Sequence, residues 1–301
     1  MSKKIMLKSI KIKNGETIGY RESGCGDKII ILVHGNMTSS KHWDILIEAM
    51  PEEYKIYAID LRGFGISSYN DPIDSIKDFS EDLKLFVDEM GLQEFYLGGW
   101  STGGGVSMQF VADYPNYVKK LILVESIGVK GYPTYPLDEK RRRLSDKPFQ
   151  SREDLAGDLV GMAPLVKAYK NKDKEFFRNL WNAVIYTHEK PSDSKYDEYL
   201  EDMLTQVNTI DVHWALIKFN ISNEHNGVTD GTGEVNKITL PTLVIQGDRD
   251  RVVVPKIGEE IKTAIGDNAT FVSLEAGHSP LIDSLEPLVK NIVNFIEDKD
   301  I

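Results

Sequence analysis

Residues 95–105 read FYLGGWSTGGG, and this stretch decides the fold. An apolar run of strand character leads into it, and residues 103–115 continue with a helical pattern. Ser101 therefore stands where a buried strand turns into a helix, with Gly99 and Gly103 two residues to either side. Side chains at those two positions would collide in so tight a turn. The pattern predicts a strained turn that presents the hydroxyl of Ser101 as a nucleophile.

The chain on both sides of this turn alternates between apolar runs of strand length and amphipathic runs of helix length. Because strands buried on both faces read as continuous apolar runs, the alternation predicts βαβ units and a parallel sheet. The strand runs are residues 28–35, 54–63, 94–101, 118–126, 240–250 and 269–278, and the helical runs are 42–50, 76–90, 103–115, 255–265 and 286–298. Before them, alternating residues 5–13 and 16–22 flank Asn14-Gly15, which predicts an antiparallel hairpin.

Residues 127–236 interrupt this alternation. The segment is polar and helical in character, and the strand pattern resumes after it. One α/β core, residues 1–126 and 237–301, with an inserted helical cap at 127–236 explains both the break and the resumption. Aromatic residues in the later part of the cap are natural pocket walls, although packing inside the cap is the ordinary role of any single one: Tyr169, Trp181, Tyr186, Tyr196, Tyr199 and Trp214.

The composition excludes several classes of partner and cofactor. The 301 residues are 41% hydrophobic and carry a formal net charge of −11, which repels phosphate backbones, so we expect no nucleic-acid partner. The basic run at 140–143, KRRR, is the local exception and is interpreted as a solvated helix face. Cys25 stands alone, so no internal disulfide and no cysteine-based zinc site can form, and we expect no metal or other cofactor.

Apolar runs in the sequence are short. The N-terminal residues MSKKIMLKSIKIKNG lack an apolar core of signal-peptide length, and no stretch approaches the roughly eighteen apolar residues that span a bilayer. We therefore expect a cytoplasmic protein that does not act in a membrane.

A serine hydroxyl is a weak nucleophile until a base takes its proton. His278 lies just past the last predicted strand, in LEAGHSP, so it can meet Ser101 at the C-terminal edge of the sheet. We therefore expect His278 to be the general base. Four of the remaining histidines are interpreted as surface or packing residues: His42, His188, His213 and His225.

Three acidic residues near strand ends are candidates to orient His278. Asp250 lies in the loop GDRD after the penultimate strand, and Glu125 ends the strand LILVE. Asp248 is closer to the strand end, where an aspartate more often completes a turn. We favour Asp250, because a Gly-x-x-Asp loop suits a carboxylate that holds the imidazole tautomer and stabilises the imidazolium.

Acyl transfer also requires two N–H donors aimed at the developing oxyanion. The residue after the nucleophile, Thr102, supplies one of them. The loop after ILVHG supplies the other, and Asn36 is favoured over Met37 as the donor. The His34-Gly35 pair lets this loop turn close to the site, so we interpret His34 as structural.

With these residues assembled, the chain resembles the α/β-hydrolase superfamily over nearly its whole length. The motifs that carry the resemblance occur in the expected order: HGN (34–36), DLRGFGIS (60–67), GWSTG (99–103), GDRD (247–250) and GHSP (277–280). The resemblance implies an α/β-hydrolase fold with a mostly parallel eight-stranded sheet, an N-terminal hairpin, helices on both faces and an inserted helical cap. It also implies that DLRGFGIS is a structural turn that supports the site.

Two narrower resemblances concern the chemistry. HGNMTSSKHW is similar to a segment of haloalkane dehalogenases, some of which keep their acid at the position of Glu125, but those enzymes use an aspartate nucleophile where this chain has Ser101. Halide displacement and epoxide opening are therefore disfavoured. The G-W-S-x-G turn and the chain length resemble intracellular polyhydroxybutyrate depolymerases, which marks Trp100 as a candidate substrate-binding residue.

The leading hypothesis is a serine hydrolase that cleaves carboxylic esters through an acyl-enzyme, with Ser101, His278 and Asp250 as its triad. Its substrate would be a small molecule or a polyester, including short-chain or 3-hydroxybutyrate esters. One alternative is a ligand-sensing protein that keeps the triad and signals through a partner. Another is a carbon–carbon bond hydrolase that uses the same three residues.

Overall fold

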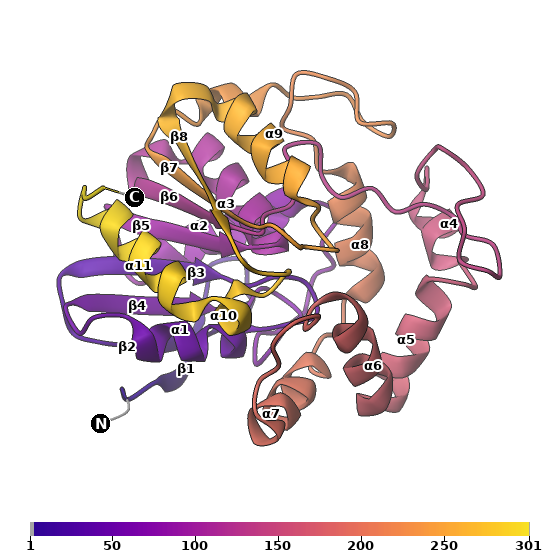
Figure 1. The fold of residues 1–301 in the computed structure, drawn as a ribbon, viewed down its shortest axis with the longest axis horizontal. Helices are drawn as coiled ribbons and strands as arrows, with labels where there is room; N and C mark the ends of the chain where they lie inside the picture. The colour runs from indigo at the N-terminus through magenta and orange to yellow at the C-terminus, as the bar shows by residue number, and fades with distance from the viewer. Residues whose placement is uncertain (1–2, 301) are drawn as a thin grey trace.

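The computed structural model describes residues 3–300, which form one eight-stranded sheet with helices around it (Figure 1). The strand order is β1-β2-β4-β3-β5-β6-β7-β8. The pairs β1–β2 and β2–β4 are antiparallel, and every later pair is parallel, so the predicted hairpin and mostly parallel sheet are confirmed. The strands are β1 Met6–Lys11, β2 Thr17–Ser23, β3 Lys28–Val33, β4 Tyr54–Ile59, β5 Phe95–Trp100, β6 Val118–Val124, β7 Thr242–Gly247 and β8 Ala269–Leu274.

Helices cover both faces of the sheet, because each central strand buries side chains in both directions. In β3, Ile31 and Val33 join the core shared with α2, α3 and α9, whereas Ile30 and Leu32 join the core shared with α1 and α11. The helices of this core are α1 Asp44–Ala49, α2 Ile76–Glu89, α3 Thr102–Asp113, α9 Pro255–Ile265, α10 Pro280–Asp283 and α11 Leu285–Ile296. Short 3-10 turns occur at η1 Ser40–Trp43, η2 Pro115–Tyr117, η3 Glu234–Lys237 and η4 Gly266–Asn268.

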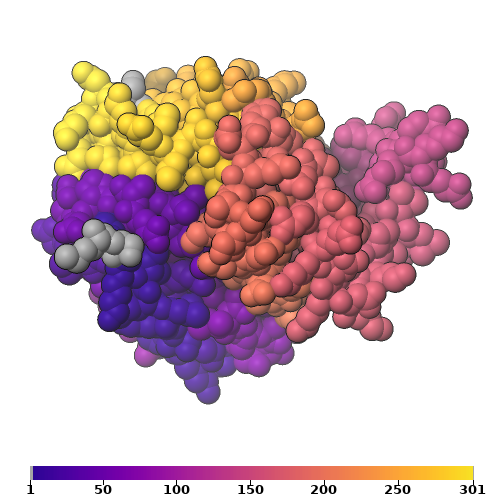
Figure 2. All heavy atoms as spheres, turned by 60° about the horizontal axis from the view of Figure 1, so that its bottom comes forward, coloured from indigo at the N-terminus to yellow at the C-terminus, as the bar shows by residue number. Residues whose placement is uncertain are grey.

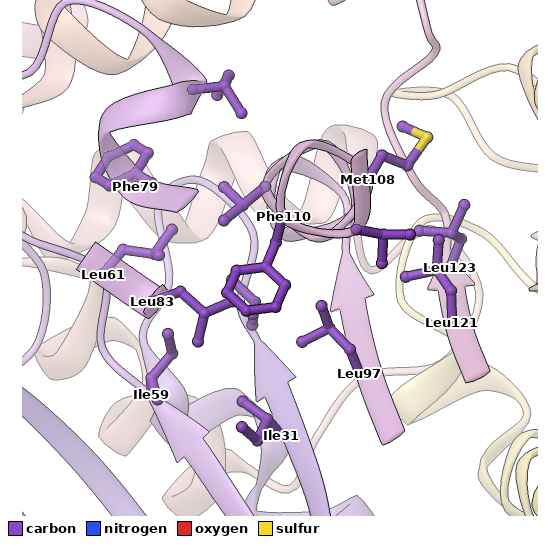
Figure 3. Packing of buried hydrophobic residues seen from close by; sticks show 14 of the residues in the cluster. Ile31, Ile59, Leu61, Phe79, Leu83, Leu97, Met108, Phe110, Leu121 and Leu123 are labelled. Carbon is purple, nitrogen blue, oxygen red and sulfur yellow. The ribbon is translucent and has the colours of Figure 1, made fainter. Parts of the chain in front are cut away.

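The helix after the Ser101 turn, α3, is buried along almost its whole length. Figure 3 shows Phe110 pointing from α3 toward the strands, between Leu83 of α2 and Leu97 of β5. All three side chains are fully buried. This packing fixes α3 against the sheet and thereby fixes the turn that precedes it.

The chain between β6 and β7 leaves the sheet and forms the inserted segment, residues 127–236. Its helices gather beside the α/β core (Figure 1), and the magenta part of the segment projects from the body of the molecule (Figure 2). That this segment is a separate cap domain stays a prediction. Within residues 3–300, no helix has the length and apolar character needed to cross a membrane. The helices of the inserted segment are α4 Arg152–Ala156, α5 Met162–Asn171, α6 Lys174–Val184, α7 Asp193–Met203 and α8 Thr209–Lys218.

The basic run at 140–143 does not lie on a helix, so its interpretation as a helix face was wrong. These residues form an exposed turn closed by a bridge between Leu137 and Arg143. Asp138 organises the turn by accepting hydrogen bonds from Arg142, and Arg143 stacks on Tyr135. Local side-chain partners, rather than helical periodicity, decide the conformation here.

Substituting Phe110→Ala should lower the free energy of unfolding by about 3–5 kcal/mol, because it removes a fully buried ring and leaves a cavity between α3 and the sheet. Urea denaturation followed by circular dichroism measures this change. The matched control is Leu159→Ala, since Leu159 is 81% exposed and its loss should change stability by less than about 0.5 kcal/mol. Equal effects of the two substitutions would contradict this account of the core.

Candidate active site

Ser101 occupies the turn between β5 and α3, as the sequence predicts. Its backbone has φ 55° and ψ −118°, a region that residues with a side chain rarely adopt. A Cβ at Gly99 would lie 2.2 Å from the carbonyl oxygen of Gly103, and a Cβ at Gly103 would lie 2.2 Å from that of Val33. The two glycines are therefore required by close backbone approach, and the turn that they allow directs the Ser101 hydroxyl away from the strand.

His278 lies in the loop after β8 and contacts Ser101. The distance from His278 Nε2 to Ser101 Oγ is 3.0 Å, and the distance from His278 Nδ1 to Asp250 Oδ2 is 2.7 Å. Because an ionised carboxylate only accepts hydrogen bonds, Nδ1 carries the proton and Nε2 is free to accept the proton of the serine hydroxyl. The three predicted residues are thus brought together in the order that proton transfer from Ser101 requires.

Of the candidate acids, Asp250 is the one bonded to His278. Its other carboxylate oxygen accepts the N–H groups of Val252 at 2.7 Å and Val253 at 3.0 Å. Burial by itself would raise the pKa of Asp250, but the charge and hydrogen bond of His278, with hydrogen bonds from Glu125 and from the N–H of Val252, hold the pKa below its usual value. Asp248 instead accepts the N–H of Ala276, at 3.2 Å, in the turn after β7.

Glu125 lies directly behind Asp250 at the end of β6. It is fully buried, its φ is 45°, and it accepts hydrogen bonds from the N–H of Gly247 at 2.6 Å and from the side chain of Gln246. Burial and the neighbouring charge of Asp250 raise the pKa of Glu125 well above its usual value. The proton of this carboxyl pair therefore resides on Glu125, and Asp250 carries the negative charge.

Glu125, Asp250 and His278 also offer three potential metal-ligand atoms within 4.8 Å of one another. Both ring nitrogens of His278 are already hydrogen-bonded, one to Ser101 and one to Asp250. A metal ion bound here would have to displace at least one of these bonds, so the cluster fits the acid end of a triad better than a metal centre.

The loop after β3 brings backbone N–H groups to Ser101. A Cβ at Gly35 would lie 3.1 Å from Ser101 Cβ, so the loop passes directly over the nucleophile. Within residues 3–300, the N–H groups of Asn36 and Thr102 donate to no protein acceptor, whereas the N–H of Met37 donates to Asn36 Oδ1 at 2.9 Å. The preference for Asn36 over Met37 as a donor is therefore consistent with the geometry.

His34 is fully buried and holds this loop in place. Its Nδ1–H donates to the carbonyl oxygen of Gly35 at 2.7 Å, and its Nε2 accepts the N–H of Leu61 at 2.9 Å. The predicted supporting turn at 60–67 is anchored in the same way, since Asp60 accepts the N–H groups of Ser40 and Ile66. Both motifs stabilise the backbone around the site.

Trp100 connects the nucleophile turn to the base. Its indole Nε1–H donates to the carbonyl oxygen of His278 at 2.8 Å, and its ring centroid lies 5.8 Å from that of His278. The side chain is 1% exposed and also packs against Trp43 and Trp181. Trp100 borders the cavity described next, but most of its surface and its only polar atom contact protein.

A cavity of about 230 Å³ opens over Ser101 and His278. Its floor is the edge of the sheet, and its opposite wall comes from α6 and α8 of the inserted segment. Most of the lining is apolar, and the residues that supply this apolar surface are Met37, Ile127, Leu180, Trp181, Val184, Ile185, Leu216 and Val252. The geometry therefore suits an apolar group attached to a polar, reacting centre.

Three polar residues of the cavity, among them Tyr132 of the inserted segment, were missed at the level of sequence. His213, interpreted as a surface or packing residue, lines the cavity, as does Arg251, which is exposed at its edge. His213 lies on α8, and helical spacing alone does not reveal which face of an inserted helix meets the active site. Arg251 directly follows Asp250, so its place beside the triad acid was the available signal.

Most of the aromatic residues of the inserted segment pack against other side chains, as their ordinary role suggests. Tyr186 and Tyr196 pack edge to face, and Tyr199 stacks on His42 with ring centroids 4.2 Å apart. His42 Nδ1 lies 3.6 Å from Asp202 of α7, so this contact joins the core to the inserted segment. Trp181 is the member of the predicted set that also lines the cavity.

The comparison with protein families agrees with this geometry. The model described as the alpha/beta hydrolase fold matches residues 28–285, and the chain therefore belongs to the α/β-hydrolase family. The match covers strands β3 to β8 and the inserted segment between β6 and β7. The protein is thus a hydrolase of this fold.

Similar curated proteins act on different bonds. A proline iminopeptidase of Pestalotiopsis fici is 26% identical over 97% of this chain and 100% of its own length, and lipase 1 of Psychrobacter immobilis is 26% identical over 96% and 83%. A 2-hydroxy-6-oxononadienedioate/2-hydroxy-6-oxononatrienedioate hydrolase of Pseudomonas is 22% identical over 96% of both chains. Among solved structures, an esterase from Exiguobacterium antarcticum matches with a TM-score of 0.73 and 17% identity, over 97% of this chain and all of that one, which supports the fold.

Substituting Trp100→Phe should slow the reaction of Ser101 with a fluorophosphonate about tenfold, because the carbonyl of His278 loses its donor and the base is held less firmly. Labelling rates measured by gel fluorescence test this expectation. Trp214→Phe is the matched control, since Trp214 does not contact the triad or the cavity in the described structure. An unchanged rate in Trp100→Phe would show that the hydrogen bond does not position His278.

The raised pKa of Glu125 predicts a pH-dependent stability. Above pH 4.5, the usual pKa of a glutamate, the unfolded chain releases a proton that the folded chain keeps, so the free energy of unfolding falls as pH rises toward the folded pKa. The Glu125→Gln variant lacks this titrating carboxyl, so its free energy of unfolding does not fall in this way. The free energy of unfolding of the variant minus that of the wild type should therefore increase by up to about 1.4 kcal/mol per pH unit in that window. Urea denaturation between about pH 5 and 8 measures the difference.

The control for this series is Glu48→Gln, which neutralises an exposed glutamate on α1. Its stability relative to the wild type should stay constant over the same pH range. If the difference for Glu125→Gln is equally flat, the proton does not reside on Glu125.

Proposed function

We propose that this protein is a serine hydrolase of carboxylic esters. The observation that carries the proposal is the continuous chain of hydrogen bonds from Ser101 Oγ through His278 to Asp250, with distances of 3.0 and 2.7 Å. His278 Nε2 takes the hydroxyl proton as Ser101 attacks the ester carbonyl, and Asp250 stabilises the resulting imidazolium. His278 then donates this proton to the leaving alcohol, and water releases the acyl group from Ser101 in a second, equivalent cycle.

The tetrahedral intermediate needs its negative oxygen stabilised. The N–H groups of Asn36 and Thr102 are suited to this role, because both residues border the cavity beside Ser101 and neither N–H has a protein acceptor within residues 3–300. The N–H of Thr102 is also at the first turn of α3, where the helix dipole favours negative charge.

The apolar cavity supports acyl groups of modest size. A volume of about 230 Å³ suits a short acyl chain better than an extended one. We therefore propose short-chain esters, including 3-hydroxybutyrate esters, as the substrate class, and the polyester polyhydroxybutyrate as one source of them. The resemblance of the GWSTG turn to polyhydroxybutyrate depolymerases supports this choice.

Carbon–carbon bond hydrolysis is the second candidate. The observation in its favour is Arg251, whose cationic side chain lines the cavity where a carboxylate-bearing diketone would need a partner. A curated relative, named above, hydrolyses a dienedioate of this chemical class. Arg251 is exposed, however, so solvent weakens its interaction with an anion, and we rank this candidate second.

Steady hydrolysis of p-nitrophenyl butyrate is the direct test. Ser101→Ala should reduce kcat/KM at least about 1000-fold, because it removes the nucleophile. The matched control is Ser9→Ala, which changes an exposed serine on β1 and should leave the rate unchanged. Circular dichroism should report the same fold for both variants.

Two results would contradict the proposal. A single turnover without a steady rate would indicate the ligand-sensing alternative, and cleavage of a vinylogous diketone acid in the absence of any esterase activity would indicate the carbon–carbon hydrolase. Within the ester class, a panel of acyl chain lengths, lactones, 3-hydroxybutyrate oligomers and amorphous polymer should show highest kcat/KM for short chains and for the oligomers.

A further inference from the structure

The side chain of Asn36 is held by the inserted segment. Its Oδ1 accepts an N–H of Gln206 at 2.9 Å, and its Nδ2 lies 3.3 Å from Nε2 of His213 on α8. Gln206 lies between α7 and α8 and is 3% exposed. The residue whose backbone N–H is the proposed oxyanion donor is therefore fixed by side chains that come 170 and 177 residues later in the chain.

Two backbone groups determine the direction of the hydrogen bonds around Gln206. The N–H of Met37 donates to Asn36 Oδ1 at 2.9 Å, so that atom is an oxygen. The carbonyl oxygen of Arg62 accepts from Asn208 Nδ2 at 2.7 Å, so the other polar atom of the Asn208 amide, Oδ1, is also an acceptor. Gln206 Nε2 lies 2.9 Å from the first oxygen and 3.1 Å from the second. It therefore donates one N–H to each, because a flipped amide would place an oxygen against two oxygens.

Gln206 is itself fixed in place. Its Oε1 accepts the hydroxyl hydrogen of Tyr169 at 2.7 Å, and its neighbour Val207 donates its backbone N–H to the carbonyl oxygen of Gly63 at 3.0 Å. Gly63 belongs to the supporting turn at 60–67. A buried amide that uses both of its donors and its acceptor is held rigidly, so Gln206 links that turn to the loop after β3.

The loop that contains Asn36 needs such a link. Met37 has a φ of 62°, in the left-handed region that a residue with a side chain rarely adopts. The N–H of Met37 is bonded to the Asn36 side chain, which leaves the N–H of Asn36 without a protein acceptor within residues 3–300. Without the bond from Gln206, the Asn36 side chain would rotate, Met37 would relax, and the N–H of Asn36 would leave its place beside Ser101.

We propose that Gln206 is a positioning residue for the oxyanion site, acting through Asn36. This inference rests on the proposed esterase function and assigns part of the oxyanion site to the inserted segment. The negative oxygen exists only in the tetrahedral intermediate and the transition states that flank it, so a donor held in advance lowers the barrier without tightening the binding of the ester. A residue that only joined the inserted segment to the core would contribute to folding and leave the chemical step unchanged.

Kinetics of p-nitrophenyl butyrate hydrolysis separate these two roles. Gln206→Leu should lower kcat about 10- to 100-fold and change KM less than about twofold, because a misplaced donor affects the transition state alone. Gln206→Glu keeps the shape of the side chain and the acceptor for Tyr169, but its carboxylate cannot donate to Asn36. It should therefore lose kcat in the same way. Circular dichroism shows whether each variant keeps the fold.

A trifluoromethyl ketone with a short alkyl chain measures the oxyanion site without turnover. Ser101 Oγ adds to its carbonyl carbon as His278 takes the serine proton. The carbonyl oxygen then becomes the negative oxygen that the N–H groups of Asn36 and Thr102 stabilise. The dissociation constant of this adduct, measured by fluorine NMR, should rise in both Gln206 variants by about the factor by which kcat/KM falls.

The matched control is Gln109→Leu. Gln109 is another buried glutamine, 4% exposed, and its side chain on α3 donates to Asp113 at 3.0 Å and to Glu234 at 3.3 Å. Its loss should lower the free energy of unfolding and leave kcat and the dissociation constant of the ketone unchanged.

A folded Gln206→Leu variant with unchanged kcat, or with a change in KM alone, would overturn the positioning role and leave the esterase proposal intact. A dissociation constant of the ketone that is the same in the wild type and in both Gln206 variants would overturn it as well. If the wild type binds the ketone but cleaves no ester, the esterase proposal fails, and the dissociation constants still decide the role of Gln206.

Discussion

The positive φ of Ser101 is a local strain on which the arrangement of the site depends. This backbone conformation costs about 1–3 kcal/mol for a residue with a side chain, so an isolated residue would relax out of it. It persists here because β5 and α3 are both fixed by burial, with Leu97 and Phe110 in one continuous core. Glycine at 99 and 103 permits the backbones to approach as closely as that packing demands. Core packing thus holds the hydroxyl where His278 can reach it.

Burial also determines where the charges of the site reside. Asp250 and Glu125 lie side by side at the ends of neighbouring strands, and two adjacent buried carboxylates cannot both be ionised. Asp250 accepts bonds from His278 and from two backbone N–H groups, so it holds the charge, while Glu125 keeps the proton. A negative Asp250 is what a His278 imidazolium needs during catalysis. Glu125 therefore supports the triad. Its position at the end of β6 is the reason why the sequence offered it as an alternative acid.

The sequence predicted the sheet, its hairpin and the residues at the strand ends, because each depends on local patterns with a strong physical cause. The Ser101 turn needs glycines at fixed offsets. Asp250 and His278 lie in the loops just after β7 and β8, so the strand pattern also locates them. The basic run at 140–143 was assigned to a helix because charge spacing alone cannot reveal a turn organised by Asp138. His213 was missed because its importance comes from how α8 meets the core, and that contact joins residues 177 positions apart.

Trp100 illustrates the same limit at a single position. The resemblance of the GWSTG turn marks Trp100 as a candidate substrate-binding residue; the side chain borders the cavity, and its indole N–H is bonded to the backbone of His278, 178 residues away. The role of a large side chain next to a nucleophile is decided by the loops that close over it. In this protein Trp100 is packed between three separate parts of the chain: the 3-10 turn η1, helix α6 and the loop after β8.

We propose above all that Ser101 is a nucleophile activated by His278. The most direct measurement is mass spectrometry of peptides from protein treated with a fluorophosphonate, in the wild type and in His278→Ala. We expect a single adduct on the peptide that contains Ser101, and a strong loss of that adduct when His278 is removed. An adduct on another residue, or labelling of Ser101 that does not depend on His278, would contradict it.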